Sequence, residues 1–175
     1  MGKIYNKSYY DKLQLTKEIQ VLKPLLLNLR EEEKKASEYV LNGKIVLNLN
    51  FRKPFIICSN SQLYRTVSIY GIMNNFNRDI KYQFVDLSNL LDIWYQSSTI
   101  IPKDKLLFTD ILIVRGRNDD WQIENKKLAL IELVEIRKMK NKPTWLFIEG
   151  LTIESFKEFY PGVDKVFGQI RQINI

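Results

Sequence analysis

Short apolar runs alternate with amphipathic segments from about residue 51 to the end of the chain. The runs PFIIC (54–58), YQFVD (82–86), DILIV (110–114) and PTWLFIE (143–149) have the length and the branched or aromatic content of strands. Within FIIC and ILIV the apolar character is continuous, which predicts strands buried on both faces. Strands that alternate with helices predict an α/β fold, a parallel sheet between two helical layers.

The segments between these runs have helical periodicity. Residues 66–76 place an apolar face on one side of a helix, and residues 123–141 read as a long helix. In LSNLLDIWYQSS (87–98), apolar side chains recur at i, i+3, i+4 and i+7. The predicted inner faces are Val67, Ile69, Tyr70, Met73 and Phe76 in the first helix, and Leu87, Leu90, Leu91 and Trp94 in the second.

The first 50 residues have a different pattern. Residues 9–41 read as helical with an interruption near Pro24, and the charged run REEEKKASEY is either a solvated helix face or a partner-binding arm. NGKIVLNLN (42–50) alternates apolar and polar residues, as a half-exposed strand or an extended connector does. We therefore expect an N-terminal helical arm and connector over residues 1–50 and an α/β core over residues 51–175.

Composition limits the classes of function that the chain can have. The 175 residues are 45% hydrophobic, enough for one sizeable core, and 27 Lys and Arg against 20 Asp and Glu leave a net charge of +7 that favours acidic partners. The absence of histidine excludes Ser-His triads and His-ligated metals within these residues. Cys58 lies in an apolar run and is predicted to be a buried core residue. With no run long enough to cross a bilayer and no secretory pattern, we expect a cytoplasmic protein without a membrane partner.

The octet SNSQLYRT (59–66) follows the first strand and opens the first helix of the core, where a phosphate-binding loop would lie. The loop pattern G-x-x-x-x-G-K-[ST] uses glycines for a backbone cradle, lysine for the phosphates and a hydroxyl for magnesium. Ser59, Tyr64 and Arg65 replace the two glycines and the lysine, and Thr66 keeps the hydroxyl. Tyr64 brings a ring where phosphate should lie, and the planar guanidinium of Arg65 is no equivalent of a compact ammonium.

In this context the chain resembles the AAA+ ATPase core of the bacterial replicative-helicase loaders, the DnaC and DnaI group, and their IstB-like relatives. The resemblance is most specific in DILIVRGRNDDWQIENKKLALIELVEIRKMKNKPTWLFIEG (110–150) and extends over residues 51–175. It aligns Asp110 with the start of the Walker B strand, Arg137 with an arginine near the end of the following helix, and Pro143-Thr144 with the start of the sensor strand. It implies a three-layer parallel sheet of the P-loop NTPase (AAA+) type, here without a substantial C-terminal lid.

The departures from this family affect its nucleotide site. Arg115 and Gly116 stand where the family has the acidic pair of Walker B, and Glu149 replaces the polar sensor. In GVDKVFGQIRQ (162–172), Lys165 and Gln169 occupy the places of the arginine finger and the arginine after it. A cation and a hydrogen cannot bind magnesium or activate water, and a carboxylate repels phosphate. One hypothesis is that Arg65 or Arg115 pairs with Glu149 across the pocket; the alternative is that these side chains point to solvent.

These substitutions predict a pseudo-ATPase, not an enzyme, whose Walker A and Walker B motifs are degenerate. Its expected role is support of DNA replication through a protein partner, namely a replicative helicase or an AAA+ loader ATPase, or through DNA. No cofactor is expected. The alternatives are a single-stranded nucleic-acid-binding module and a weak ATPase in which a divergent loop still holds ATP and magnesium.

The sequence contains two further groups of residues with candidate chemistry. Asp110 with Glu124 and Lys126 has the order of a metal-dependent nuclease site, but Glu124 and Lys126 open a helix where such a site needs a strand. The second consists of basic residues near an aromatic ring, as in surfaces that bind single strands. Its members are Arg115, Arg117, Trp121, Lys138 and Lys140. For the lysines, the alternative is a favourable interaction with the dipole of the helix that ends there.

Overall fold

The computed structural model describes residues 48–60, 63–76, 80–95 and 101–174. The predicted arm over residues 1–50 lies outside this part except for residues 48–50. Five strands form one sheet, and every neighbouring pair is parallel. They are β1 (Phe55–Ser59), β2 (Tyr82–Asp86), β3 (Ile111–Arg117), β4 (Thr144–Glu149) and β5 (Ile170–Ile173), in the order β2-β3-β4-β1-β5.

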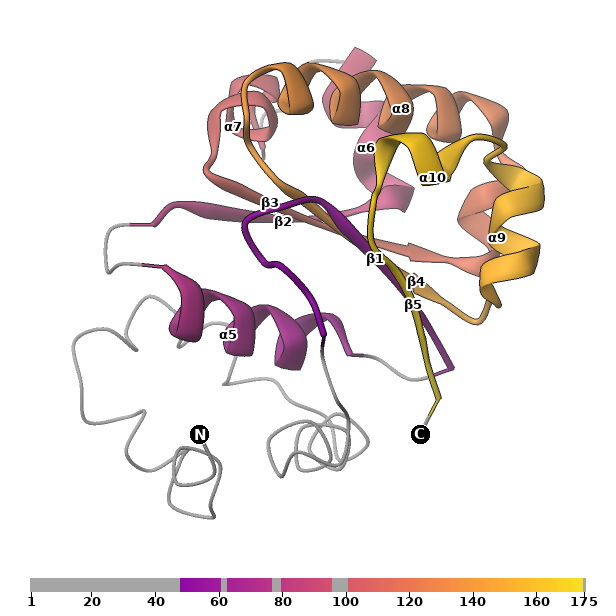
Figure 1. The fold of residues 1–175 in the computed structure, drawn as a ribbon. Coiled ribbons are helices and arrows are strands. Elements are labelled where there is room, and N and C mark those ends of the chain that lie inside the picture. Colours follow the sequence, from indigo (N-terminus) through magenta and orange to yellow (C-terminus); the bar gives the residue numbers. More distant parts are fainter. Residues whose placement is uncertain (1–47, 61–62, 77–79, 96–100, 175) are drawn as a thin grey trace.

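Helices cover both faces of this sheet, so the predicted three-layer α/β fold is confirmed (Figure 1). Among the described helices, α5 (Tyr64–Asn75) is the one on the first face. The other face carries α6 (Leu87–Tyr95), α7 (Lys103–Phe108), α8 (Glu124–Met139), α9 (Ile153–Phe159) and α10 (Val163–Val166). A short 3-10 helix, η1 (Asn118–Gln122), joins β3 to α8.

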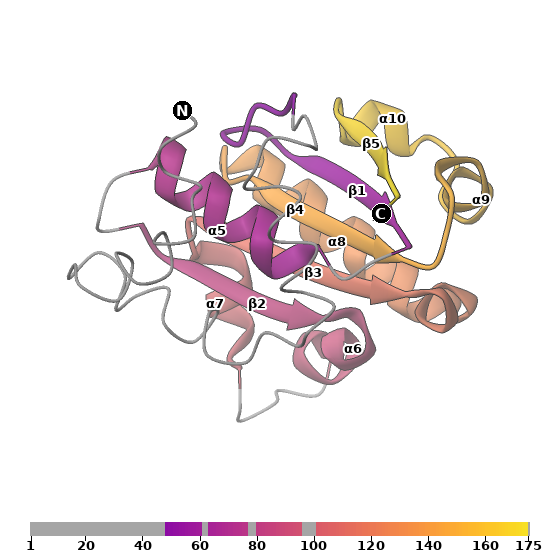
Figure 2. The same cartoon turned by 90° about the horizontal axis from the view of Figure 1, so that it is seen from below.

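This division follows from the direction in which the chain crosses the sheet. The β1-to-β2 connection runs towards one edge, whereas the later connections all run the opposite way, towards β5 (Figure 2). Parallel crossovers share one hand, so a crossover that runs in the reverse direction must use the other face. Helix α5 is therefore separated from the rest.

Each face has its own apolar core, because the central strands are buried on both sides. In β4, Trp145 and Phe147 face α5, while Leu146 and Ile148 face the other helices. On the α5 side, Phe51 packs so closely on Gly71 that a Cβ at this glycine would overlap the phenyl ring. The two cores fix the sheet between the helical layers.

The predicted strands and helices of the core are all present, with shifts of one to three residues at most ends. Strand β3 runs beyond the predicted end to include Arg115, Gly116 and Arg117. The core positions of Cys58, Trp94 and Trp145 are confirmed. Burial, with a smaller contribution from the charge of Glu154, raises the pKa of Cys58 to about 12, so this thiol stays protonated at neutral pH.

The pattern did not predict α7, α9, α10 or β5, which are short elements. Over the described residues, no helix combines the length and apolar character that a membrane span requires.

Candidate nucleotide site at the carboxyl ends of the strands

The octet SNSQLYRT connects β1 to α5 at the point where the direction of the connections changes. From β1 the chain passes to α5 on one face, and from the neighbouring β4 it passes to α9 on the other. Ligands of open α/β sheets bind at such switch points, outside the carboxyl ends of the strands. Ser59 and Glu149, the last residues of β1 and β4, lie opposite each other there.

The backbone is ordinary at Ser59 and Tyr64, the two positions where a phosphate-binding loop has glycine. Ser59 ends β1, is buried, and accepts a hydrogen bond from the Gly150 N–H at 2.9 Å. Tyr64 is the first residue of α5. Among the described residues, positive φ occurs at Asn141, Gly150 and Gly162, so neither Ser59 nor Tyr64 is strained. Neither position therefore needs the conformational freedom of glycine.

Tyr64 packs into the site, with 8% of the residue exposed. Its hydroxyl oxygen accepts hydrogen bonds from Arg65 Nε at 2.8 Å and from Arg115 Nη1 at 3.5 Å. The guanidinium carbons of these two arginines lie 5.4 and 4.8 Å from the ring centroid, within cation–π range. The ring thus occupies space at the start of α5, as predicted. The side chain of Thr66 lies outside the described part of the structure.

Arg115 and Glu149 form a bidentate ion pair across the carboxyl ends of β3 and β4. Arg115 Nε lies 2.7 Å from Oε1 of Glu149, and Arg115 Nη2 lies 3.2 Å from its Oε2. Only 11% and 15% of the two side chains are exposed, so the hypothesis of an internal pair is confirmed for Arg115 and solvent-facing side chains are excluded. Burial alone would lower the pKa of Arg115, but the hydrogen bond and charge of Glu149 raise it above its usual value.

Register explains why these two residues meet. Arg115 lies beside Phe147 in the β3–β4 ladder, and Glu149 follows Phe147 by two residues on the same face of the sheet. Their long side chains close the diagonal gap between the two strands. Arg65, the other candidate partner of Glu149, donates to Tyr64.

A cavity of about 340 Å³ lies beside the pair, towards β2. Tyr64, Phe84 and Ile101 supply apolar wall, and polar groups come from Arg65, Asp86, Asn89 and Arg115. Asp86 is the one carboxylate among its lining residues, and its charge acts on Arg115. The described residues contain no cluster of three acidic, Cys or His side chains that could hold a metal ion.

Gly116 lies in tight packing against side chains. A Cβ there would lie 3.1 Å from the Trp121 ring and 3.2 Å from Leu87 Cδ2. Trp121 is buried to 2% exposure and contacts Phe156 edge to face at 4.8 Å between centroids. The interpretation of Trp121 as a surface platform for nucleic acid was therefore wrong, because η1 turns the ring into the core.

The basic residues predicted to bind nucleic acid do not form one surface. Arg115 and Arg117 lie at the carboxyl end of β3. Lys138 and Lys140 are exposed at the end of α8, which returns the chain to the amino end of β4. The two arginines and the two lysines therefore lie at opposite ends of the strands.

The nuclease constellation does not assemble either. Asp110 precedes β3 at the amino edge, where its carboxylate pairs with Lys142 at 3.1 Å. Glu124 begins α8 beyond the opposite edge and pairs with Lys127, while Lys126 pairs with Asp120. Asp110 and Glu124 therefore lie at opposite ends of β3, and they cannot bind the same metal ion.

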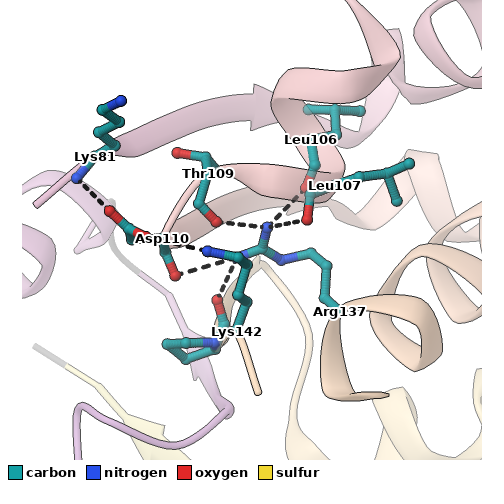
Figure 3. A network of polar contacts seen from close by, with 8 residues as sticks. Lys81, Leu106, Leu107, Thr109, Asp110, Arg137 and Lys142 are labelled. Carbon is teal, nitrogen blue, oxygen red and sulfur yellow. Dashed lines mark hydrogen bonds and ion pairs between the residues drawn. The ribbon is translucent and has the colours of Figure 1, made fainter. Parts of the chain in front are cut away.

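Arg137 has a structural role (Figure 3). The side chain is fully buried and donates to the carbonyl oxygens of Leu106 at 2.7 Å, Thr109 at 2.9 Å and Pro143 at 2.9 Å, and to Thr144 Oγ1 at 3.1 Å. Burial lowers its pKa to about 10 against the opposing charge of Asp110, so Arg137 remains a cation at neutral pH. It joins the ends of α7 and α8 to the amino edge of the sheet.

The two C-terminal positions also differ in role. Gln169 accepts from the Asn50 N–H at 2.7 Å and donates to the carbonyl oxygens of Asn50 and Pro54, which fastens the connector before β1. Lys165 is exposed on α10. Gln169 therefore has a structural role in holding the segment before β1, and Lys165 faces solvent.

Comparison with known proteins gives distant similarities. No family profile matches the chain. A protein described as a serine protease DegP homolog of Plasmodium falciparum is 26% identical over 135 residues, which make up 77% of this chain and 14% of that protein. The crystal structure of a DNA replication initiation factor has a TM-score of 0.46 and 11% identity, over 85% of this chain and 48% of its own. AMPPCP-bound DnaA from Aquifex aeolicus has the same TM-score and identity, over 98% and 51%. This chain spans about half the length of these two structures.

Proposed function

We propose that the chain is a non-catalytic, AAA+-like protein that supports DNA replication by binding a replicative helicase, a loader ATPase of the AAA+ type, or DNA. The observation that carries the proposal is the Arg115–Glu149 ion pair at the β1/β4 switch point. Polar groups that would face a nucleotide in an ATPase are bonded to each other here. The work of such a protein is done by its surfaces, independently of nucleotide.

The chemistry of the site supports the absence of hydrolysis. Hydrolysis of a phosphoanhydride needs a metal ion or a strong cationic clamp and a group that positions water. At the end of β3 the carboxylates required for magnesium are replaced by Arg115 and Gly116. At the end of β4 the carboxylate of Glu149 would face the phosphate and repel it, and its removal would take the bidentate partner from Arg115 in a largely buried position.

Serine-protease activity, which the Plasmodium protein's description suggests, is not proposed for this chain. A Ser-His-Asp triad needs an imidazole to take the serine proton, and these 175 residues contain no histidine.

A titration with a fluorescent ATP analogue, with and without magnesium, tests the proposal. We expect no saturable binding at millimolar nucleotide, because Tyr64 and the ion pair occupy the site. The matched control is Arg65→Ala, which removes the cation nearest the start of α5. Saturable binding by the wild type that is lost in Arg65→Ala would contradict the proposal and favour a weak ATPase with a divergent loop.

A further inference from the structure

An exposed surface with lysines around an aromatic ring lies at the end of the sheet opposite the nucleotide site. We call it the α7–α8 corner, and it consists of Lys105 and Phe108 of α7 and Lys138, Met139 and Lys140 at the end of α8. Phe108 is 55% exposed and Met139 is 76% exposed. Lys140 Nζ lies 4.9 Å from the centroid of the Phe108 ring, which joins the two helices at this surface.

The lysines of this corner project from a rigid turn. Helix α8 ends in a Schellman motif, in which the Lys142 N–H donates to the Arg137 carbonyl and the Asn141 N–H donates to the Lys138 carbonyl, both at 3.0 Å. Asn141 supplies the left-handed residue that the motif requires, with φ of 54°. The backbone below Lys138 and Lys140 is therefore fixed.

The corner keeps its positive charge. In the described part of the chain, no carboxylate lies within ion-pair distance of Lys105, Lys138 or Lys140. Asp110 lies nearby, but its carboxylate is held by Lys142 and by the Lys81 N–H (Figure 3). Glu135 adds to the effect of burial in raising the pKa of Tyr160, and in the described part of the chain it forms no ion pair with these lysines.

The dipole of α8 favours Lys138, which lies in its last turn. At the end of α7, the carbonyls of Leu106 and Leu107 already accept hydrogen bonds from the buried Arg137. Neither dipole gives a reason for an exposed phenyl ring beside the lysines. An aromatic ring surrounded by lysines matches single-stranded nucleic acid, in which bases stack and phosphates pair with cations.

We propose that the α7–α8 corner binds single-stranded nucleic acid, with Phe108 stacking on a base and Lys105, Lys138 and Lys140 holding the adjacent phosphates. An acidic peptide would pair with the lysines but would not need the exposed ring. This inference rests on the proposed function, in which the protein acts by binding a partner or DNA, and it identifies the surface that would bind DNA.

Fluorescence anisotropy of the full chain with a labelled 25-nucleotide oligo-dT, measured across a salt series, tests the inference. We expect Lys140→Glu to weaken binding by about tenfold or more and to flatten the dependence on salt, because a phosphate contact is lost. Phe108→Ala should weaken binding by about tenfold with the salt dependence retained, and Phe108→Tyr should restore binding. The matched charge reversal is Arg117→Glu, at the opposite end of β3, which should change affinity less than about threefold.

Circular dichroism of each variant confirms that it is folded before binding is compared. The inference is overturned if the wild type binds no oligo-dT at low salt, if Lys140→Glu and Arg117→Glu weaken binding equally, or if poly-glutamate competes as well as oligo-dT. The last result would assign the corner to an acidic protein partner. None of these results depends on nucleotide, so a failure here leaves the ATP-analogue test untouched, and binding of ATP would leave this inference standing.

Discussion

Arg115 and Glu149 compensate each other's charge at the carboxyl ends of β3 and β4. Because only 11% and 15% of the two side chains are exposed, either charge without the other would be costly there. Together they satisfy each other through two hydrogen bonds, and Tyr64 covers the guanidinium. The compensation does not require a ligand.

A mutant cycle measures this compensation. Glu149→Gln should lower the free energy of unfolding by about 2 kcal/mol, because it leaves Arg115 with a neutral partner. The double variant Arg115→Met/Glu149→Leu should lose less free energy of unfolding than Arg115→Met and Glu149→Leu lose in sum, since neither charge then remains. Urea unfolding followed by tryptophan fluorescence gives the values. A loss below about 0.5 kcal/mol for Glu149→Gln would mean that the pair is not formed in solution.

At the scale of elements, Arg137 connects α7 to α8 and to the residues that precede β3 and β4. Helix α7 has only six residues, and it is joined through one guanidinium to α8 and to the starts of β3 and β4. The donors of that planar group point in several directions at once, which an ammonium cannot reproduce from the same position.

We therefore expect Arg137→Lys and Arg137→Met to destabilise the fold by similar amounts, about 3 kcal/mol each, because both leave buried carbonyls without donors. Lys138→Met, one residue away and exposed, serves as the control and should change stability by less than about 0.5 kcal/mol. The midpoint and slope of urea unfolding give the free energy of unfolding of each variant. If Arg137→Lys were as stable as the wild type, charge alone would explain the role of Arg137.

The elements that the sequence predicts are those with long or continuous apolar patterns, such as β1, β4 and α8. The elements it did not predict are short and mixed in character. In β5, for example, Arg171 and Gln172 separate two isoleucines, and α7 has a single fully buried residue, Leu106. Such segments become regular through contacts with distant parts of the chain, which local periodicity does not contain.

For the whole molecule, the order of the strands decides which residues meet. The octet at 59–66 could be recognised locally, because a strand, a turn and a helix follow each other in the sequence. The pairing of Arg115 with Glu149 was one of two alternatives from sequence, and the β3–β4 register selects it. The basic residues seemed to form one group along the chain, but the sheet places Arg117 and Lys140 at opposite ends.

This arrangement gives the molecule two ends that differ in their polar groups. At the carboxyl ends of the strands, Arg115 and Glu149 bond to each other beside the cavity. At the amino ends, Lys140 and Phe108 remain exposed above the buried Arg137. The proposed nucleic-acid surface therefore lies at the opposite end of the strands from the Arg115–Glu149 pair, and the two can be tested separately.

The measurement that tests the central claim most directly is the stability of the unmodified chain with and without ATP and magnesium. Because a ligand that binds the native state raises its free energy of unfolding, ATP at 100 times its dissociation constant would add about 2.7 kcal/mol. We predict identical urea midpoints with and without millimolar MgATP. An increase that grows with the concentration of ATP would show that the site still binds nucleotide, and would contradict the account.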